Sequence, residues 1–319
     1  MNMLNSNTNT CLLCRGPLKL DGHSYIDTRF GIKETYTIGS CAVCCIKQIV
    51  PTPPAETLQE LYECYYNFCG EHDTLYTKMR GIFYDSFLYQ MWLAMDGDIS
   101  FHRRQGTGRL LDVGCNEGRG LIIYRKNGYT VEGLELNRNA AALARSHGFI
   151  VHTDLIEDFL PQGLYDVVVL SNVIEHSLNP HDMLSHVARL LKPGGAVWIS
   201  CPNNESWMSK IFGKSWINWH VPFHIVHFSD HALRRLLNSH GFSVTEFRDT
   251  SPALWAAQSL IASLFSQRGH RTGLLRNPLL ILFLMFVFRG ILFPFLWLGD
   301  KFGTGDCLIV TAKKDNITN

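Results

Sequence analysis

The sequence has no excess of charge of either sign. Its 29 lysines and arginines nearly balance 28 aspartates and glutamates, its pI is near 7.6, and no cluster of basic residues stands out. A protein that binds a nucleic acid backbone needs a basic surface that neutralises several phosphates. We therefore expect no nucleic acid partner.

The sequence also lacks a secretory signal and an apolar run of membrane-spanning length. The first ten residues, MNMLNSNTNT, contain neither the basic start nor the apolar stretch of a signal peptide. No apolar run reaches the ~20 residues that a spanning helix needs. Because no signal is present, we expect a cytoplasmic protein, whose cysteines are then mostly reduced. With 46% hydrophobic and 18% charged residues, the composition is that of a globular protein.

Four of the ten cysteines form two closely spaced pairs. Cys11 and Cys14 precede two stretches with strand character, 23–30 and 34–38, and Cys41 and Cys44 follow them. Two such pairs brought together by a hairpin are typical of a zinc ribbon, here residues 1–50. We predict a structural zinc ion, because four thiolates leave no coordination position open for chemistry. Cys45 is the alternative to Cys44 as the fourth ligand.

Residues 51–107 are expected to form a helical linker or lid. Pro51, Pro53 and Pro54 interrupt the chain before a stretch with large side chains at helical spacing. These side chains are Leu58, Leu61, Tyr62, Tyr65 and Tyr66. They either pack the small module against the large one or cover an active site.

From residue 109 onwards, strands alternate with helices. The strands are expected at 109–113, 130–135, 149–153, 166–170, 196–200, 243–248 and 306–312. This alternation predicts an α/β fold with a doubly wound, mostly parallel, seven-stranded sheet covered by helices on both faces. Ligands bind such a sheet at the carboxyl ends of its strands.

A glycine-rich turn and an acidic residue mark those carboxyl ends. Gly114 and Gly118 follow the first strand, in a spacing that differs from the dinucleotide-binding fingerprint. Glu135 ends the next strand about twenty residues later, where a carboxylate accepts hydrogen bonds from the two hydroxyls of a ribose. The pair predicts a ligand that contains a nucleoside.

Four motifs in this order resemble the class I S-adenosylmethionine-dependent methyltransferase family over residues 109–250. They are Leu111-Asp-Val-Gly-Cys115, Gly133-Leu-Glu135, the segment from Tyr165 to Glu175-His176, and Leu191-Lys-Pro-Gly-Gly195. The cysteine module, the prolines and the tyrosine-rich helix resemble a bacterial subgroup with an N-terminal zinc ribbon, whose members are common in polysaccharide and cell-envelope functions. The sequence departs from the family at the middle glycine of the loop, which is Asn116 here.

The resemblance implies roles for individual residues in binding S-adenosylmethionine. Asp112 and Gly114 would flank the methionine portion, Glu135 would hold the ribose, and Asp154 or the backbone of Leu155 would meet the adenine amino group. Ser171 and Asn172 would line the cavity for methyl transfer, and the remaining predicted cofactor contacts are Cys115, Asn116, Gly118 and Leu136.

Methyl transfer from a sulfonium needs a base only to deprotonate the acceptor. Histidine suits this role near neutral pH. The candidates are His176, just after the fourth strand, and His224 and His227, in a loop before a capped helix.

An apolar insertion, 252–303, separates the last two strands, so the methyltransferase domain is expected at 108–251 and 304–319. The apolar runs within 279–298 are too short to span a bilayer. We expect them to form a helical anchor that touches the inner face of the membrane, with Arg289 and Trp297 near the headgroups, or the surface of a homodimer.

The leading hypothesis is therefore a methyltransferase acting on a small-molecule, glycan or lipid-linked acceptor. One alternative is a ribosomal RNA base methyltransferase with a zinc module, against which the neutral charge counts. The other is a non-catalytic scaffold with a degenerate cofactor pocket, for which Asn116 is the only sign.

Overall fold

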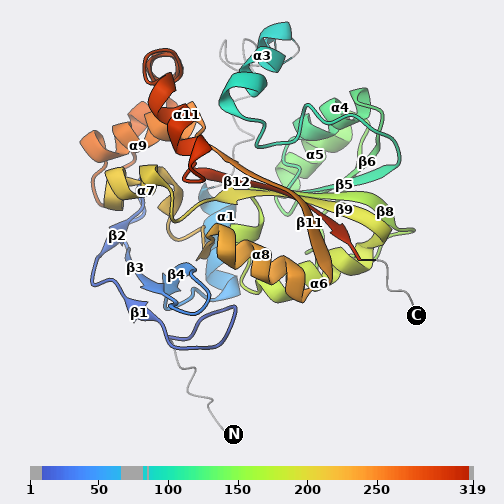
Figure 1. Ribbon diagram of the computed structural model, residues 1–319, viewed down its shortest axis with the longest axis horizontal. Coiled ribbons are helices and arrows are strands. Elements are labelled where there is room, and N and C mark those ends of the chain that lie inside the picture. Colours follow the sequence, from blue (N-terminus) through green and yellow to red (C-terminus); the bar gives the residue numbers. More distant parts are fainter. Residues whose placement is uncertain (1–8, 66–81, 85, 316–319) are drawn as a thin grey trace, which may run out of the picture.

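The computed structural model describes residues 9–65, 82–84 and 86–315, and its centre is a seven-stranded sheet (Figure 1). The strand order is β11-β12-β9-β8-β5-β6-β7, and only β12 runs antiparallel to its neighbours. The strands are β5 (Arg109–Val113), β6 (Thr130–Leu134), β7 (Ile150–His152), β8 (Tyr165–Ser171), β9 (Leu191–Pro202), β11 (Phe242–Thr250) and β12 (Cys307–Lys314). The predicted fold class is confirmed.

Helices cover both faces of this sheet. Helices α4 (Arg119–Lys126) and α5 (Arg138–Ser146) lie on one face, and α6 (Pro180–Leu190) and α8 (Asp230–Ser239) lie on the other (Figure 1). Three of them begin at the expected caps, because the side chains of Asn137, Asn179 and Ser229 accept hydrogen bonds from the first-turn amides. The helices therefore hold the carboxyl ends of β5, β6, β8 and β9 at one edge.

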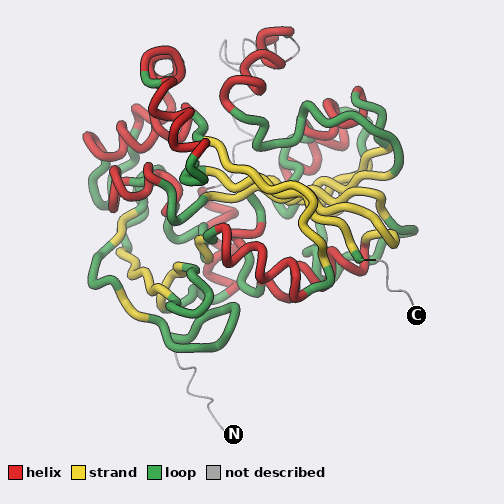
Figure 2. Tube along the Cα trace, in the orientation of Figure 1, coloured by secondary structure: helices red, strands yellow, loops and turns green. Residues whose placement is uncertain are grey.

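The N-terminal module forms a second, smaller sheet. It contains β1 (Lys19–Leu20), β2 (Tyr25–Ile26), β3 (Thr35–Ser40) and β4 (Lys47–Val50). A strand that comes much later in the sequence, β10 (Val226–His227), pairs antiparallel with β4. One hydrophobic core runs from Ile38 and Ile49 in this module to Val168 and Ile199 in the large sheet. The two sheets are therefore packed together as one body (Figure 2).

The segment between the sheets contains α1 (Ala55–Tyr65) and α3 (Phe87–Asp96). Tyr62 of α1 packs edge-on against Phe223, in the loop before β10. Tyr66 lies outside the described residues. Helix α1 therefore contacts the loop that leads into β10, whereas α3 lies on the opposite side of the large sheet (Figure 1).

Two further groups of short helices complete the chain. After β8 and β9 come η1 (Ile174–His176), α7 (Trp207–Phe212), η2 (Gly213–Ser215) and η3 (Ile217–Trp219). The insertion before β12 contains α9 (Ala253–Phe265), η4 (Gly273–Arg276), α10 (Pro278–Phe286), the π-helical turn η5 (Val287–Ile291) and α11 (Phe293–Lys301).

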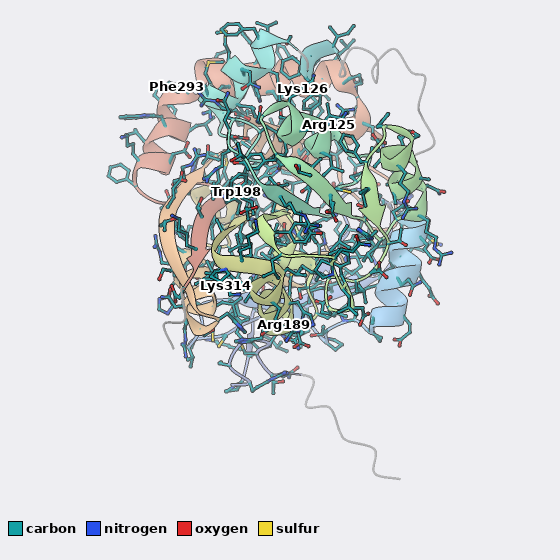
Figure 3. The ribbon with its side chains drawn as sticks, turned by 90° about the vertical axis from the view of Figure 1, so that its right-hand side faces the viewer. Arg125, Lys126, Arg189, Trp198, Phe293 and Lys314 are labelled. Atoms are coloured by element: carbon teal, nitrogen blue, oxygen red, sulfur yellow. The ribbon has the colours of Figure 1, made fainter. Side chains whose placement is uncertain are left out.

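The insertion exposes much of its apolar surface. Phe286 is 70% exposed and Phe295 is 62% exposed. Phe293, 43% exposed, lies at the edge of the molecule in Figure 3, whereas Trp198 of β9 lies inside. Within the described ranges, no single helix has the length and apolarity to cross a membrane, although 278–291 and 293–301 meet those criteria as a pair bent by 69°.

The prediction for Arg289 is wrong. Its side chain is 6% exposed, and its Nε donates to the Oδ1 of Asp96 at 3.0 Å. Burial of a cation requires a partner of opposite charge, and the last residue of α3 supplies it. Arg289 therefore fixes the insertion to α3 and does not reach the surface.

Candidate functional site

The glycine turn after β5 is hydrogen-bonded to the end of β6. The N–H groups of Gly114 and Cys115 both donate to the Leu134 carbonyl, at 2.8 and 3.0 Å. The Glu135 carboxylate accepts from the Asn116 N–H at 2.8 Å and from the Asn137 N–H at 2.7 Å. Burial raises the pKa of Glu135. The structure thus brings Gly114, Asn116 and Glu135 together at one edge of the sheet.

Asn116 adopts the backbone conformation that a glycine would provide. Its φ is +50°, and the glycines on either side of it in the loop also have positive φ values, +70° at Gly114 and +79° at Gly118. Asparagine enters this left-handed region more readily than other residues with a side chain. Its Oδ1 also accepts from the Glu117 N–H at 2.9 Å. The loop therefore keeps its turn despite the departure from the family pattern.

Asp112 lies buried beneath this loop, with 6% exposure. Burial, together with the nearby charge of Glu135, raises the pKa of Asp112 to about 7. A Cβ atom on Gly120 would lie 2.8 Å from the Asp112 Oδ2 and 3.6 Å from the His102 Nε2, so the three groups are neighbours. A cationic ligand group beside Asp112 would favour its ionised form. The ammonium of S-adenosylmethionine fits this requirement.

The end of β8 lies beside the glycine turn. A Cβ atom on Gly114 would be 3.1 Å from the Cγ2 of Val173. Asn172 has a φ of +54°, and its N–H donates to the Ser200 carbonyl at 2.9 Å. The Ser171 hydroxyl donates to the Ile99 carbonyl at 3.1 Å. Ser171 therefore holds the segment before β5 against the sheet.

Three of the predicted cofactor contacts, including the two expected near the adenine, lie at the surface after β6 and β7. Leu136 is 56% exposed, Leu155 is 50% exposed, and Asp154 is also exposed. Cys115 is buried below the loop, against Gly133. Position alone assigns no contact to these residues, and their roles stay predictions.

The three candidate histidines lie close together. The rings of His176 and His224 are 4.7 Å apart, and those of His224 and His227 are 6.2 Å apart. Burial lowers the pKa of His176 and of His227 to about 4, and it also lowers the pKa of His224 well below its usual value. All three rings are therefore neutral near pH 7, the form in which a histidine accepts a proton.

Hydrogen bonds fix the rings of His176 and His224. His176 Nδ1 lies 2.7 Å from the Tyr62 hydroxyl and 2.9 Å from the Phe223 carbonyl. His224 Nδ1 lies 2.8 Å from the Asn218 carbonyl. Because a carbonyl only accepts, we assign the proton to Nδ1 in both rings, which leaves both Nε2 atoms unprotonated.

The sequence analysis missed several side chains, one beside the candidate histidines and others near Asp112. Glu175, beside His176, is 1% exposed, and its carboxylate lies near His224. Asp98 accepts hydrogen bonds from the backbone N–H groups of His102 and Arg103, and His102 Nδ1 lies 2.6 Å from the Tyr89 hydroxyl. The only signal in the sequence was that Glu175 adjoins a candidate base.

The four predicted zinc ligands form one cluster. Their Sγ atoms lie within 4.8 Å of one another, and those of Cys14 and Cys41 are 3.5 Å apart. Thiolates around a tetrahedral zinc ion are about 3.8 Å apart, so the arrangement fits the ion. Cys45 is outside the cluster, in a left-handed turn with a φ of +58°.

Comparison with known proteins agrees with this geometry. A family model described as a methyltransferase domain matches residues 94–246. A ubiquinone biosynthesis O-methyltransferase from Pectobacterium atrosepticum is 32% identical over 124 residues, or 36% of this chain and 52% of that protein. One from Erwinia tasmaniensis is 30% identical over 141 residues, or 41% and 56%. The chain spans about half the length of these curated relatives.

Solved structures with the same kind of domain also match. A putative sarcosine dimethylglycine methyltransferase from Galdieria sulphuraria has a TM-score of 0.47 at 16% identity, covering 75% of this chain and 88% of that one. An S-adenosylmethionine-dependent methyltransferase from Archaeoglobus fulgidus has a TM-score of 0.45 at 20% identity, covering 72% and 100%.

The sheet order, the glycine turn bonded to Glu135 and the family match together define a class I methyltransferase domain. The family model thus identifies residues 94–246 as a methyltransferase domain.

Proposed function

We propose that this chain transfers a methyl group from S-adenosylmethionine to a hydroxyl of a small-molecule acceptor. The observation that carries the proposal is the Glu135 carboxylate, which is bonded to the glycine-loop amide of Asn116 and lies near the buried Asp112. An acid at the tip of β6 is placed to hold a ribose, and Asp112 to hold the methionine ammonium. The relatives from ubiquinone biosynthesis are named O-methyltransferases, which supports oxygen as the methylated atom.

The proposed methyl-transfer cavity lies between the end of β8 and the histidine group, which we define as His176, His224 and His227. Asn172 and Val173 border the glycine turn, and His176 follows three residues later. We place deprotonation of the acceptor at His176, His224 and His227, whose rings are neutral near pH 7. The sulfonium is a good leaving group, so orientation of the acceptor supplies most of the remaining rate.

We also propose a domain organisation that follows from this function. A structural zinc ion at Cys11, Cys14, Cys41 and Cys44 orders a ribbon over residues 1–50. The linker or lid is 51–107, the methyltransferase unit is 108–251 with 304–319, and the apolar insertion is 252–303. The contact between Tyr62 and His176 supports a lid at the active site.

The acceptor is proposed to be lipid-linked, such as a glycan precursor at the inner face of a membrane. Exposed apolar side chains on α10 and α11 support this choice, because a contiguous apolar surface of this kind marks an interaction site. Phe283, Phe286 and Phe295 are each more than 60% exposed. Flotation with anionic vesicles tests the contact: Phe283→Ser with Phe286→Ser should abolish it, and Leu160→Ser, an exposed leucine elsewhere, should not. Concentration-dependent dimers without flotation would instead support a homodimer surface.

The decisive experiment for function is transfer of a labelled methyl group to fractionated cell extract. Label in the lipid or small-molecule pool supports the proposal, and label in glycan freed from lipid by mild acid supports the finer acceptor class. Label in RNA alone would favour the ribosomal RNA alternative. A chain that shows no saturable binding of S-adenosylmethionine by calorimetry would be the scaffold protein instead.

A further inference from the structure

Glu175 is an unusual buried carboxyl group in this molecule. Its side chain is 1% exposed, and within the described part of the chain no other residue donates a hydrogen bond to either carboxylate oxygen. The nearest imidazole nitrogen, His224 Nε2, is 4.0 Å from Oε1, which is too long for a hydrogen bond. Apart from the amide of its own residue, neither the ionised nor the protonated carboxyl therefore has a hydrogen-bond partner. A buried polar group without one is costly and indicates a missing ligand.

The atoms that surround Glu175 are of the kinds that bind metal ions. One oxygen of Glu175 and one ring nitrogen from each of His176 and His224 lie within 4.8 Å of one another. Both Nε2 atoms are unprotonated, because both Nδ1 atoms face backbone carbonyls, those of Phe223 and Asn218. Histidines that bind metals are oriented in this way, with the second nitrogen donating to a carbonyl or carboxylate.

We propose that Glu175, His176 and His224 bind a divalent transition-metal ion, separate from the zinc of the cysteine module. Two imidazoles and one carboxylate match the protein ligands of catalytic zinc sites and leave a fourth position open. Such ligand atoms lie about 3.4 Å apart around a tetrahedral ion, so the three side chains move inward by up to roughly 1 Å.

The open position gives this ion a role beside the cofactor. The segment that carries His176 begins at Val173, in contact with the glycine turn. A divalent ion would lower the pKa of a bound hydroxyl toward neutral, and the proton would pass to His227, the one candidate base that is not a proposed ligand. This role rests on the proposed function, whereas the site itself does not.

Cobalt titration of the full chain tests the site. After chelation, Co²⁺ should bind in two equivalents, one with the sulfur-to-metal charge-transfer bands of a four-thiolate centre and one with only weak visible bands. Glu175→Gln and His224→Gln should each lose the second equivalent and keep the thiolate spectrum. His186→Gln, which changes a partly exposed histidine on α6, should keep both.

Uptake of a single equivalent by the unmodified chain would overturn the site, whether or not the variants fold. Retention of the second equivalent by both folded variants would also overturn it. Calorimetry with S-adenosylmethionine on the same samples separates the two proposals. A chain with two metals and no cofactor binding keeps the metal site and loses the proposed function.

Discussion

At the scale of single residues, Glu135 is the side chain proposed to hold the ribose of the cofactor. Its carboxylate accepts hydrogen bonds from the Asn116 and Asn137 amides, which fix it at the end of β6. Glu135→Ala should weaken binding of S-adenosylmethionine by roughly 1–3 kcal/mol, the scale of hydrogen bonds to a charged group. Titration calorimetry measures the loss.

Two further variants make the Glu135 measurement specific. Glu135→Gln keeps an acceptor oxygen and should lose less affinity than the alanine variant. Glu60→Ala removes an exposed acid of α1 and should leave the affinity unchanged. Full affinity in Glu135→Ala would remove this residue from the cofactor site.

Residues whose role depends on neighbours close in sequence were predictable, and those that depend on distant partners were not. Glu135 follows a strand and a glycine turn in a fixed order, so its position at the sheet edge could be inferred. Glu175 gains its meaning from His224, 49 positions away, and Arg289 from Asp96, 193 positions away. Arg289 was assigned to the surface because its apolar neighbours give no sign of a buried acid.

At the scale of elements, the start of α4 depends on a close approach to α5. A Cβ atom on Gly118 would lie 2.8 Å from the Cβ of Ala144, and Gly118 has a φ of +79°. Gly148 has nearly the same φ, +77°, and nothing within 4 Å of such an atom. Both alanine variants should lose about 1 kcal/mol from backbone strain. Gly118→Ala should lose roughly 1–3 kcal/mol more from overlap.

Denaturant unfolding and cofactor calorimetry check this pair. Gly148→Ala should bind S-adenosylmethionine normally, whereas Gly118→Ala should bind it weakly because the loop must shift. Equal stability of the two variants would show that Ala144 can move away from the added Cβ atom without loss of folding free energy.

A second test at this scale concerns the ion pair that joins three elements. The Asp96 Oδ1, at the end of α3, accepts from Arg289 in η5 and from the Ala253 N–H at the start of α9. Arg289→Met should cost about 3–5 kcal/mol at pH 8, because it leaves a buried carboxylate without its cation. Lys301→Met, at an exposed lysine, should change stability by less than about 0.5 kcal/mol.

The Asp96–Arg289 pair also predicts a pH dependence. Burial raises the pKa of Asp96 to about 6 even with Arg289 present. Without the arginine, the carboxyl is neutral at still higher pH, so the cost of Arg289→Met should shrink as pH falls from 8 to 5. Asp96→Asn in the same chain should remove this dependence. A cost that stays constant with pH in urea titrations would contradict the assignment.

Elements with a regular period were predicted well, and paired elements from distant segments were not. The strands and helices from residue 109 to 250 follow alternating patterns and helix caps that are visible locally. Strand β10 has two residues and exists because Val226 and His227 pair with Gln48 and Lys47. No local pattern marks a strand of that length.

At the scale of the whole molecule, the cysteine module and the methyltransferase domain are joined more closely than the sequence indicated. They share a hydrophobic core, the β4–β10 pairing, and a contact of 2.9 Å between His181 Nε2 and the Leu13 carbonyl. A module whose folding depended only on its metal ion would not need these contacts with the large domain. The ribbon pattern predicted the ligands, but spacing between cysteines carries no information about what the module packs against.

This shared core predicts one cooperative unfolding transition for the metal-loaded chain. Strand β10 pairs with β4 of the ribbon and follows His224 by two residues. Loss of the ribbon therefore also releases the loop that carries His224 and His227. Chelation, or Cys41→Ser, should lower the midpoint of the whole transition, because the free energy of metal binding is also free energy of folding. Cys64→Ser, at an exposed cysteine outside the cluster, should leave the midpoint unchanged. Scanning calorimetry that resolves a separate ribbon transition, with an unshifted main peak after Cys41→Ser, would show two independent units and contradict the shared core.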